Sequence, residues 1–269
     1  MKWTTAILSL ALATGCATSP TGRKQLILVP DDQMDQLGAQ AFTEIQKETP
    51  VTKNGQAMQY VSCIAKSITS VLPKEYQGAW DVKVFESEQV NAFALPGKKI
   101  GVFTGLLKVA VNQDQVATVM GHEVGHVLAR HGNERVSQNV ILQSGLSVVD
   151  AFVGGSATQR NLIMGALGVG AQFGVVLPHG RTQESEADRI GLELMAAAGF
   201  DPKESVDLWQ NMGKASGGQE PPEWMSTHPA NASRIAGLQE HMAMAEGERA
   251  KAKAAGRVPQ CGSAGIAAN

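Results

Sequence analysis

The chain has 269 residues, a formal net charge of −2 and an aromatic content of only 5%. A nearly balanced charge gives no electrostatic basis for binding nucleic acid, and so few aromatic side chains form no platform for stacking bases. The length allows one domain of about 230 residues with a sizeable core, in addition to an N-terminal signal. We therefore expect a single globular domain with no nucleic-acid partner.

The N-terminus has the features of an export signal. A lysine precedes an apolar run at residues 6–13, and the letters A-T-G-C ending at Cys16 resemble a bacterial lipoprotein signal. We expect a signal peptide at residues 1–15, lipidation of Cys16 and a linker at residues 16–30. Ala17 after the cysteine is typical of an outer-membrane destination, so the expected location is the periplasmic side of the outer membrane, with a lipid anchor. An ordinary secretory signal is the alternative.

Most of the chain has apolar residues at helical spacing, and two short segments alternate as strands do. The strands are expected at residues 80–85 and 100–104, which places a small sheet ahead of the motif described next. The predicted helices cover residues 31–47, 52–72, a stretch that follows Asn112, and residues 137–153, 161–176, 182–198, 205–212 and 231–246. The fold class is therefore α+β, mostly helical. Its domain is expected at residues 31–245, with a low-complexity tail at 246–269.

The most informative motif is H-E-V-G-H at residues 122–126. Positions four apart on an α-helix return to nearly the same face, so His122 and His126 can hold one ion. Glu123 lies about 60° round the helix from His126, which suits a general base better than a third ligand. Asn112 can cap the start of this apolar helix. The motif predicts a catalytic zinc site, and two hydrogen-bonded core histidines are the alternative.

A catalytic zinc usually has three protein ligands and one open position, so a third ligand is needed. His131 would point about 140° away on a continuous helix, and we interpret it as a helix C-terminal imidazole followed by Gly132 as the stop. Glu184 is the better candidate. It shares a face of a later helix with Asp188, which could hold the N–H of a ligating histidine, although a solvated acidic first turn is the alternative. Glu186 is interpreted as solvated.

The motif H-E-V-G-H followed by E-S-E-A-D resembles the metallopeptidase family of HtpX and the CAAX prenyl proteases, family forty-eight of the peptidase classification. Segments 91–97, 105–107 and 226–229 also match, so the resemblance covers most of the chain. It implies a single-domain bacterial lipoprotein member with a gluzincin-type site. In such a site Glu184 is the third ligand beside His122 and His126, and each chain binds one zinc ion.

The resemblance also brings the histidine of S-T-H-P close to the active site. Peptide cleavage needs a hydrogen-bond donor that stabilises the developing oxyanion. The two tyrosines, Tyr60 and Tyr76, both lie early in the chain, so we do not expect either to be this donor. We expect His228 to stabilise the oxyanion or to occupy the open zinc position in a resting state, with an ordinary loop histidine as the alternative. Arg234 either reaches the site or caps acidic neighbours.

By the same resemblance Asn91, Ala92, Phe93 and Ala94 form an edge strand beside the active site. An extended substrate could add backbone hydrogen bonds along such an edge, as an extra strand does. Binding of this kind favours unfolded or flexible protein segments. An ordinary sheet edge protected by Pro96 is the alternative.

Residues 136–177 carry very little charge and many glycines. A helical pair over the active-site cleft, acting as a mobile lid, fits this composition, and a plain core hairpin fits nearly as well. A transmembrane hairpin would need about 20 apolar residues in each span, and these runs are shorter.

Three cysteines are present, and lipidation of Cys16 would leave Cys63 and Cys261. Because an exported chain meets an oxidising compartment, we expect these two to form a disulfide, with two free thiols as the alternative. The bridge would tie the C-terminal tail to the first helical region.

Together these observations predict a membrane-anchored zinc endopeptidase that cleaves misfolded or unassembled envelope proteins. The quality-control role is implied by the resemblance, as are envelope partner proteins. The alternative is a chaperone-like lipoprotein of outer-membrane assembly whose protease site is gated or latent.

Overall fold

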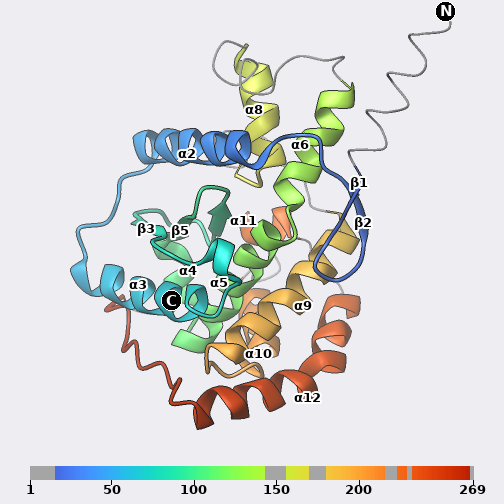
Figure 1. The fold of residues 1–269 in the computed structure, drawn as a ribbon. Helices are drawn as coiled ribbons and strands as arrows, with labels where there is room; N and C mark the ends of the chain where they lie inside the picture. Colours follow the sequence, from blue (N-terminus) through green and yellow to red (C-terminus); the bar gives the residue numbers. More distant parts are fainter. Residues whose placement is uncertain (1–15, 143–155, 170–179, 216–222, 229–231, 267–269) are drawn as a thin grey trace, which may run out of the picture.

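The computed structural model describes residues 16–142, 156–169, 180–215, 223–228 and 232–266. Helices predominate in these residues, and the strands form one two-stranded and one three-stranded sheet (Figure 1). The expected mostly helical α+β architecture is therefore confirmed. Among the described helices, none combines the length and the apolar character that crossing a bilayer requires.

The three-stranded sheet contains β3 (Asp81–Phe85), β4 (Ala92–Leu95) and β5 (Lys99–Phe103), in the order β3-β5-β4. The central strand β5 is parallel to β3 and antiparallel to β4. The two strands expected from alternation are present, and β4 lies at the edge of the sheet. Strand β4 also packs against α5 (Gln113–Leu128).

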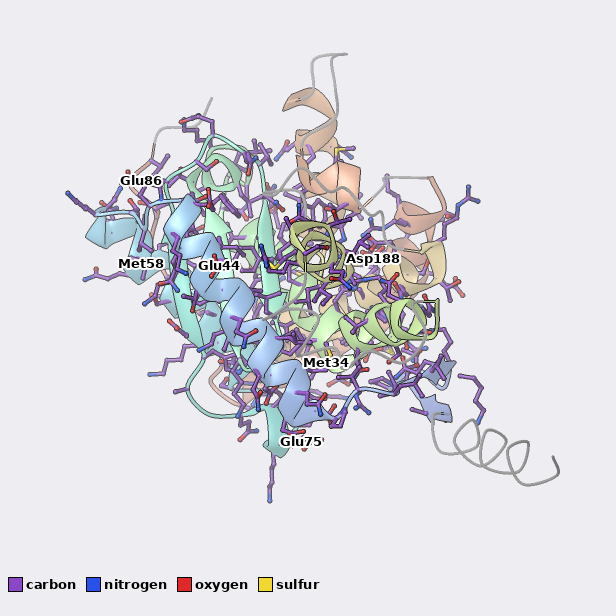
Figure 2. All side chains as sticks on the ribbon, turned by 90° about the horizontal axis from the view of Figure 1, so that it is seen from above. Met34, Glu44, Met58, Glu75, Glu86 and Asp188 are labelled. Atoms are coloured by element: carbon purple, nitrogen blue, oxygen red, sulfur yellow. A yellow bond between two sulfur atoms is a disulfide. The ribbon has the colours of Figure 1, made fainter. Side chains whose placement is uncertain are left out.

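Helix α2 (Asp31–Glu48) covers one face of this sheet, as seen from above in Figure 2. Phe42 of the helix meets Phe85 and Phe93 of the strands, and these two contact Phe103, with neighbouring ring centroids 5.5–6.1 Å apart. Gly101 lies opposite Phe93, and a Cβ at residue 101 would come within 2.2 Å of that ring. The glycine therefore makes room for the aromatic cluster.

The larger core surrounds α5, which runs through the middle of the molecule (Figure 1). Asn112 caps this helix as expected, because its side chain accepts hydrogen bonds from the backbone N–H groups of Asp114 and Gln115. Helices on several sides bury it, so it is apolar nearly all round. The helices that complete this layer are α3 (Gly55–Thr69), α4 (Thr104–Val109), α9 (Arg181–Ala197), α10 (Glu204–Ala215), α11 (Glu223–Thr227) and α12 (Ala232–Ala254).

Several helix boundaries differ from the sequence-based expectation, most clearly those of α6 (His131–Leu142) and α12. Helix α6 begins six residues earlier than predicted, and α12 continues to Ala254, past the expected end of the domain at residue 245. Helix α8 (Ala157–Ala166) lies in the glycine-rich stretch at residues 136–177 and overlaps the helix predicted at residues 161–176. Residues 143–155 and 170–179 lie outside the described residues, so the predicted helical pair is tested only in part.

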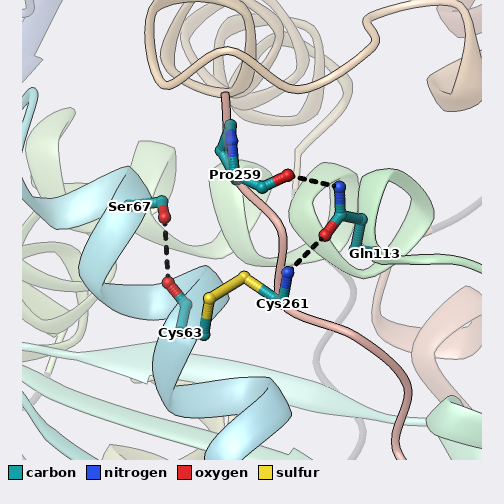
Figure 3. The surroundings of a disulfide bond; sticks show 5 residues. All are labelled: Cys63, Ser67, Gln113, Pro259 and Cys261. Atoms are coloured by element: carbon teal, nitrogen blue, oxygen red, sulfur yellow. Dashed lines mark hydrogen bonds between the residues drawn. A yellow bond between two sulfur atoms is a disulfide. The ribbon is translucent and has the colours of Figure 1, made fainter. Parts of the chain in front are cut away.

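A disulfide joins Cys63 of α3 to Cys261, with the two Cα atoms 5.5 Å apart (Figure 3). The side chain of Gln113 holds the C-terminal segment next to the bridge through two hydrogen bonds. Its amide donates to the carbonyl of Pro259, and its carbonyl accepts from the backbone N–H of Cys261, both at 2.9 Å. The tail predicted to be low-complexity is therefore attached to the body of the fold.

Residues 16–30 were expected to be a linker, and this expectation is wrong for the first part of the segment. Strands β1 (Cys16–Thr18) and β2 (Lys24–Leu26) form an antiparallel hairpin that packs beside α6 and α9 (Figure 1). Three-residue strands are too short to give a recognisable alternation, so the sequence pattern did not indicate them. The hairpin contributes polar contacts to the candidate site, described below.

Candidate metal centre

Helix α5 carries the first three residues of the site. His122, Glu123 and His126 are buried, each with at most 5% of its surface exposed. The i, i+4 spacing places the two imidazoles on one face, and their Nε2 atoms lie 3.0 Å apart. Both rings therefore direct Nε2 toward one point.

Helix α9 crosses α5 at very close range, and glycines make the crossing possible. A Cβ at Gly191 would lie 2.6 Å from the backbone nitrogen of His122, and one at Gly121 would lie 2.8 Å from the carbonyl oxygen of Gly191. Gly125 similarly faces the backbone of Ala187. The two helix backbones therefore nearly touch, which brings the acidic residues of α9 to the histidines of α5.

Glu184 of α9 is the carboxylate that reaches the two imidazoles. Its oxygens lie 3.5 Å from Nε2 of His122 and 3.3 Å from Nε2 of His126, and only 1% of its surface is exposed. Burial alone would raise the pKa of Glu184, but the neighbouring histidines hold it well below its usual value. The carboxylate of Glu184 is therefore ionised and can provide an oxygen ligand to a metal ion.

His228 completes a cluster of four. It follows α11, and its Nδ1 lies 3.1 Å from Oε1 of Glu184 and 3.3 Å from Nε2 of His122. The facing donor atoms of His122, His126, Glu184 and His228 all lie within 4.8 Å of one another. The position of this histidine was open from the sequence, and the structure places it among the other three.

The spacing of these atoms fits a transition-metal ion. With metal–nitrogen distances near 2.0–2.1 Å, tetrahedral ligand atoms are separated by about 3.3 Å, which is close to the 3.0–3.5 Å found between His122, His126 and Glu184. Two imidazoles and a carboxylate, with a fourth position beside them, are the donor set of a catalytic zinc site. These residues therefore suit zinc, and other divalent ions share the same preference for nitrogen and oxygen.

The two α5 histidines have different electrostatic surroundings. Burial lowers the pKa of His122, but its hydrogen bonds with Asp188 and Glu184 outweigh this and raise it to about 9. Burial lowers the pKa of His126 well below its usual value of 6.5. His126 is therefore neutral, as a metal ligand must be, whereas a metal ion would displace a proton from His122.

Asp188 and Arg234 hold the imidazole of His122 in place. Oδ1 of Asp188 lies 2.9 Å from Nδ1 of His122, and the guanidinium of Arg234 donates to both oxygens of Asp188 at 2.6 Å. Arg234 also lies 2.8 Å from Glu184 and sits over the ring of Trp209. The two interpretations left open for Arg234 therefore both hold, because the acidic neighbours that it pairs with are residues of the site.

His131 and Glu186 were misinterpreted from the sequence, because both belong to the support of His126. Nδ1 of His131 lies 2.8 Å from Nδ1 of His126, and Nε2 of His131 lies 3.1 Å from Oε2 of Glu186. His131 is fully buried, and Glu186 is only 5% exposed. Glu186 is therefore not part of a solvated first turn.

The reason for the His131 error is a break in the backbone. Helix α5 ends at Leu128, Arg130 adopts a positive φ of 56°, and α6 starts at His131. An angle of about 140° holds only on one continuous helix, whereas the left-handed Arg130 turns the chain so that His131 faces back toward the site. Glu186 was missed because α9 is buried on the side away from α5 as well, where the N-terminal hairpin covers it.

Trp224 is a further residue near the site that the sequence did not indicate. Its indole N–H donates to Oε1 of Glu123 at 2.7 Å, and its ring lies against that of His228. Its backbone N–H also donates to the carbonyl of Val90, just before β4. Trp224 therefore links α11 both to the segment just before β4 and to Glu123.

A cavity of about 230 Å³ opens beside Glu123 and His126. Phe93 and Ala94 of β4 line it, together with Tyr76, Trp80 and Arg135 from other elements. Asn91 and Ala92, the other two predicted substrate-binding residues, are buried in the sheet and are not part of this lining. Within the described residues β4 pairs only with β5, so one edge of the strand is free of a neighbouring strand.

Comparisons with known proteins agree with this geometry. The profile of peptidase family M48 matches residues 53–242. The mitochondrial metalloendopeptidase OMA1 of Schizosaccharomyces pombe is 33% identical over 191 residues, which is 71% of this chain and 54% of that protein. OMA1 of Arabidopsis thaliana is 40% identical over 156 residues, 58% of this chain and 30% of that protein.

A bacterial relative is the beta-barrel assembly-enhancing protease of Yersinia pestis, 25% identical over 209 residues, 76% of this chain and 43% of that protein. The chain thus spans about half or less of the length of these relatives. They are not HtpX or prenyl proteases, so the narrower resemblance has no support in these matches. The broader expectation is confirmed: with the profile matched from residue 53 to 242, the chain belongs to peptidase family M48, a family of metallopeptidases.

Proposed function

We propose that this chain is a zinc-dependent endopeptidase that hydrolyses peptide bonds in misfolded or unassembled envelope proteins. The observation that carries the proposal is the convergence of His122, His126 and Glu184 on one point, with Glu123 beside them in the lining of the 230 Å³ cavity. Two imidazoles and a carboxylate held together in this way are the donor set of a divalent cation such as zinc.

Zinc bound there would act as a Lewis acid that activates a water molecule and polarises the substrate carbonyl. Glu123 then takes the proton of the attacking water and later gives it to the leaving amine. The indole N–H of Trp224, 2.7 Å from Oε1 of Glu123, holds this carboxylate in place. Asp188 fixes the ring of His122 through Nδ1, which leaves Nε2 for the metal.

Substrates would bind as an extra strand along the free edge of β4. Phe93 and Ala94 bring this edge to the cavity that also contains Glu123. Backbone pairing requires an extended segment, which a folded protein does not offer. The edge therefore supports a preference for unfolded chains.

A gated form of the same enzyme is the second candidate. The observation that favours it is the position of His228, whose Nδ1 lies 3.1 Å from Glu184 and 3.3 Å from Nε2 of His122. An imidazole at this place takes the position that a catalytic site keeps open. His228 would have to move away before the substrate could approach, and until then the chain would act as a latent, chaperone-like protein.

We further propose that lipidated Cys16 holds the enzyme at the periplasmic side of the outer membrane. Support comes from the lipoprotein-like signal before Cys16 and from the bacterial relative, whose name refers to the assembly of β-barrels. Envelope proteins are then both its substrates and its partners.

The test is cleavage of casein by the zinc-loaded full chain in detergent. Wild type should cleave, and Glu123→Gln should lower the rate by about 10²–10⁴-fold, the usual contribution of a general base. Glu193→Gln, an exposed change on α9, serves as the control. A silent wild type with an active His228→Ala variant would establish gating. Silence from wild type, Glu123→Gln and His228→Ala alike would refute the peptidase.

A further inference from the structure

We propose that the N-terminal hairpin positions the metal ligand His126 through a hydrogen-bonded chain that runs from the hairpin to Glu186, then to His131 and then to His126. We call these groups the relay. The inference rests on the metal site proposed above, and it assigns positioning roles to His131, Glu186 and Arg23.

The relay is continuous and buried. Nδ1 of His126 lies 2.8 Å from Nδ1 of His131, and Nε2 of His131 lies 3.1 Å from Oε2 of Glu186. None of the three side chains has more than 6% of its surface exposed. Water therefore cannot replace any of these hydrogen bonds without a rearrangement of the core.

The chemistry of the groups sets the direction of the protons. An ionised carboxylate only accepts hydrogen bonds, so Glu186 requires His131 to carry its proton on Nε2. The lone pair on Nδ1 of His131 then accepts from His126, which must carry its proton on Nδ1. The remaining lone pair of His126 is on Nε2, the atom that faces His122 and Glu184. The relay therefore selects the tautomer in which His126 can bind a metal ion.

The hairpin supplies most of the donors that hold Glu186. The hydroxyls of Ser19 and Thr21 both donate to Oε1, and Nε of Arg23 donates to Oε2 at 2.8 Å. Arg23 also makes a two-pronged contact with Glu134, at 2.7 Å for each pair of atoms. Residues 19–23 are the turn between β1 and β2, so their docking on α6 and α9 is what orients Glu186.

The two ligating histidines are thus supported from opposite ends of the chain. His122 is held by Asp188 and Arg234, the latter from α12, whereas His126 is held by His131 and the hairpin. Outer partners of this kind commonly change metal affinity by 10–100-fold when they are removed. The hairpin should therefore contribute to zinc affinity even though it contains no ligand.

The experiment measures zinc binding by the full chain in detergent, by competition with a chromophoric chelator. Glu186→Gln should weaken zinc binding by about 10–100-fold, whereas Glu193→Gln on the exposed side of the same helix should leave it unchanged. Urea unfolding of the zinc-free proteins shows whether each variant is folded. Unchanged zinc affinity in a folded Glu186→Gln variant would overturn the relay.

A second readout separates positioning from a merely structural role. Imidazole nitrogen chemical shifts should report His126 protonated on Nδ1 and His131 protonated on Nε2 in wild type, and this pattern should be lost in Glu186→Gln. If that variant does not fold, Arg23→Gln on the partly exposed hairpin replaces it, with a smaller loss of affinity in the same direction. Wild-type tautomers in the folded variant would refute the proposal as well, whatever its zinc affinity. If the wild-type protein binds no zinc, the proposed function itself is refuted.

Discussion

Replacing Gly191 by alanine should force α5 and α9 apart at the point where the candidate site is built. A Cβ at residue 191 would lie 2.6 Å from the backbone nitrogen of His122 and 2.8 Å from the carbonyl carbon of Gly121. These are backbone atoms, which cannot rotate away as a side chain can. The closest approach is about 0.8 Å inside the 3.4 Å at which ordinary contact begins, so we expect a separation of the helices by roughly that distance.

The expected change in the free energy of unfolding is the difference between two effects of the added methyl group. Overpacking of this kind destabilises by about 1–3 kcal/mol, while exchanging a glycine within a helix for alanine stabilises by about 1 kcal/mol. Gly247→Ala in α12 gives the second effect alone, because residue 247 is exposed and its Cβ would meet no atom within 4 Å. The free energy of unfolding should therefore be lower in Gly191→Ala than in Gly247→Ala by about 1–3 kcal/mol.

Urea unfolding of the zinc-free proteins measures this difference, and casein cleavage measures its effect on the site. His122 would move relative to Glu184 by nearly 1 Å, and a displacement of that size commonly lowers a rate by about 10²-fold. Gly247→Ala should cleave casein as wild type does. If Gly191→Ala were as stable as Gly247→Ala and fully active, the close crossing of α5 and α9 would not be what builds the site.

Three further outcomes test other parts of the fold. Changing Cys63 and Cys261 together to serine should lower the free energy of unfolding by up to about 5 kcal/mol, because the bridge closes a loop of 198 positions. Adding reductant to both proteins should remove the difference between this variant and wild type. Arg23 holds the pKa of Glu134 below its usual 4.5 despite burial, so the stability this carboxylate adds is complete above pH 4.5 and is lost as pH falls through the lowered pKa. In urea titrations between pH 6 and 3 Glu134→Gln should therefore lose less stability than wild type. Arg234→Met should destabilise the zinc-free protein by about 3–5 kcal/mol, because it leaves two buried carboxylates without their guanidinium; a loss below 1 kcal/mol would contradict this.

The residues of the candidate site could be placed from the sequence where they lie at regular spacing on one helix. His122 and His126 are four apart on α5, and Glu184 and Asp188 are four apart on α9, so helical geometry alone predicts which side chains share a face. The cap at Asn112 was predictable for the same local reason. In each case the contacts that decide the position lie within one turn.

What could not be predicted depends on contacts between distant segments. The turn of His131 toward His126 follows from the positive φ of Arg130, a residue type that rarely adopts it. The burial of Glu186 depends on Arg23, 163 positions earlier. The order of the sheet also depends on such contacts, because nothing within β3 specifies that it pairs with β5 rather than with β4.

The disulfide between Cys63 and Cys261 has a practical consequence for work on this chain. All four clustered residues, from His122 to His228, lie within the covalent ring that it closes. A single cut of the backbone anywhere in that ring leaves the two fragments joined through sulfur. Chain that has nicked itself, or has been nicked by another protease, would still migrate as one species on a gel run without reductant. Self-cleavage between these cysteines must therefore be scored on reduced samples.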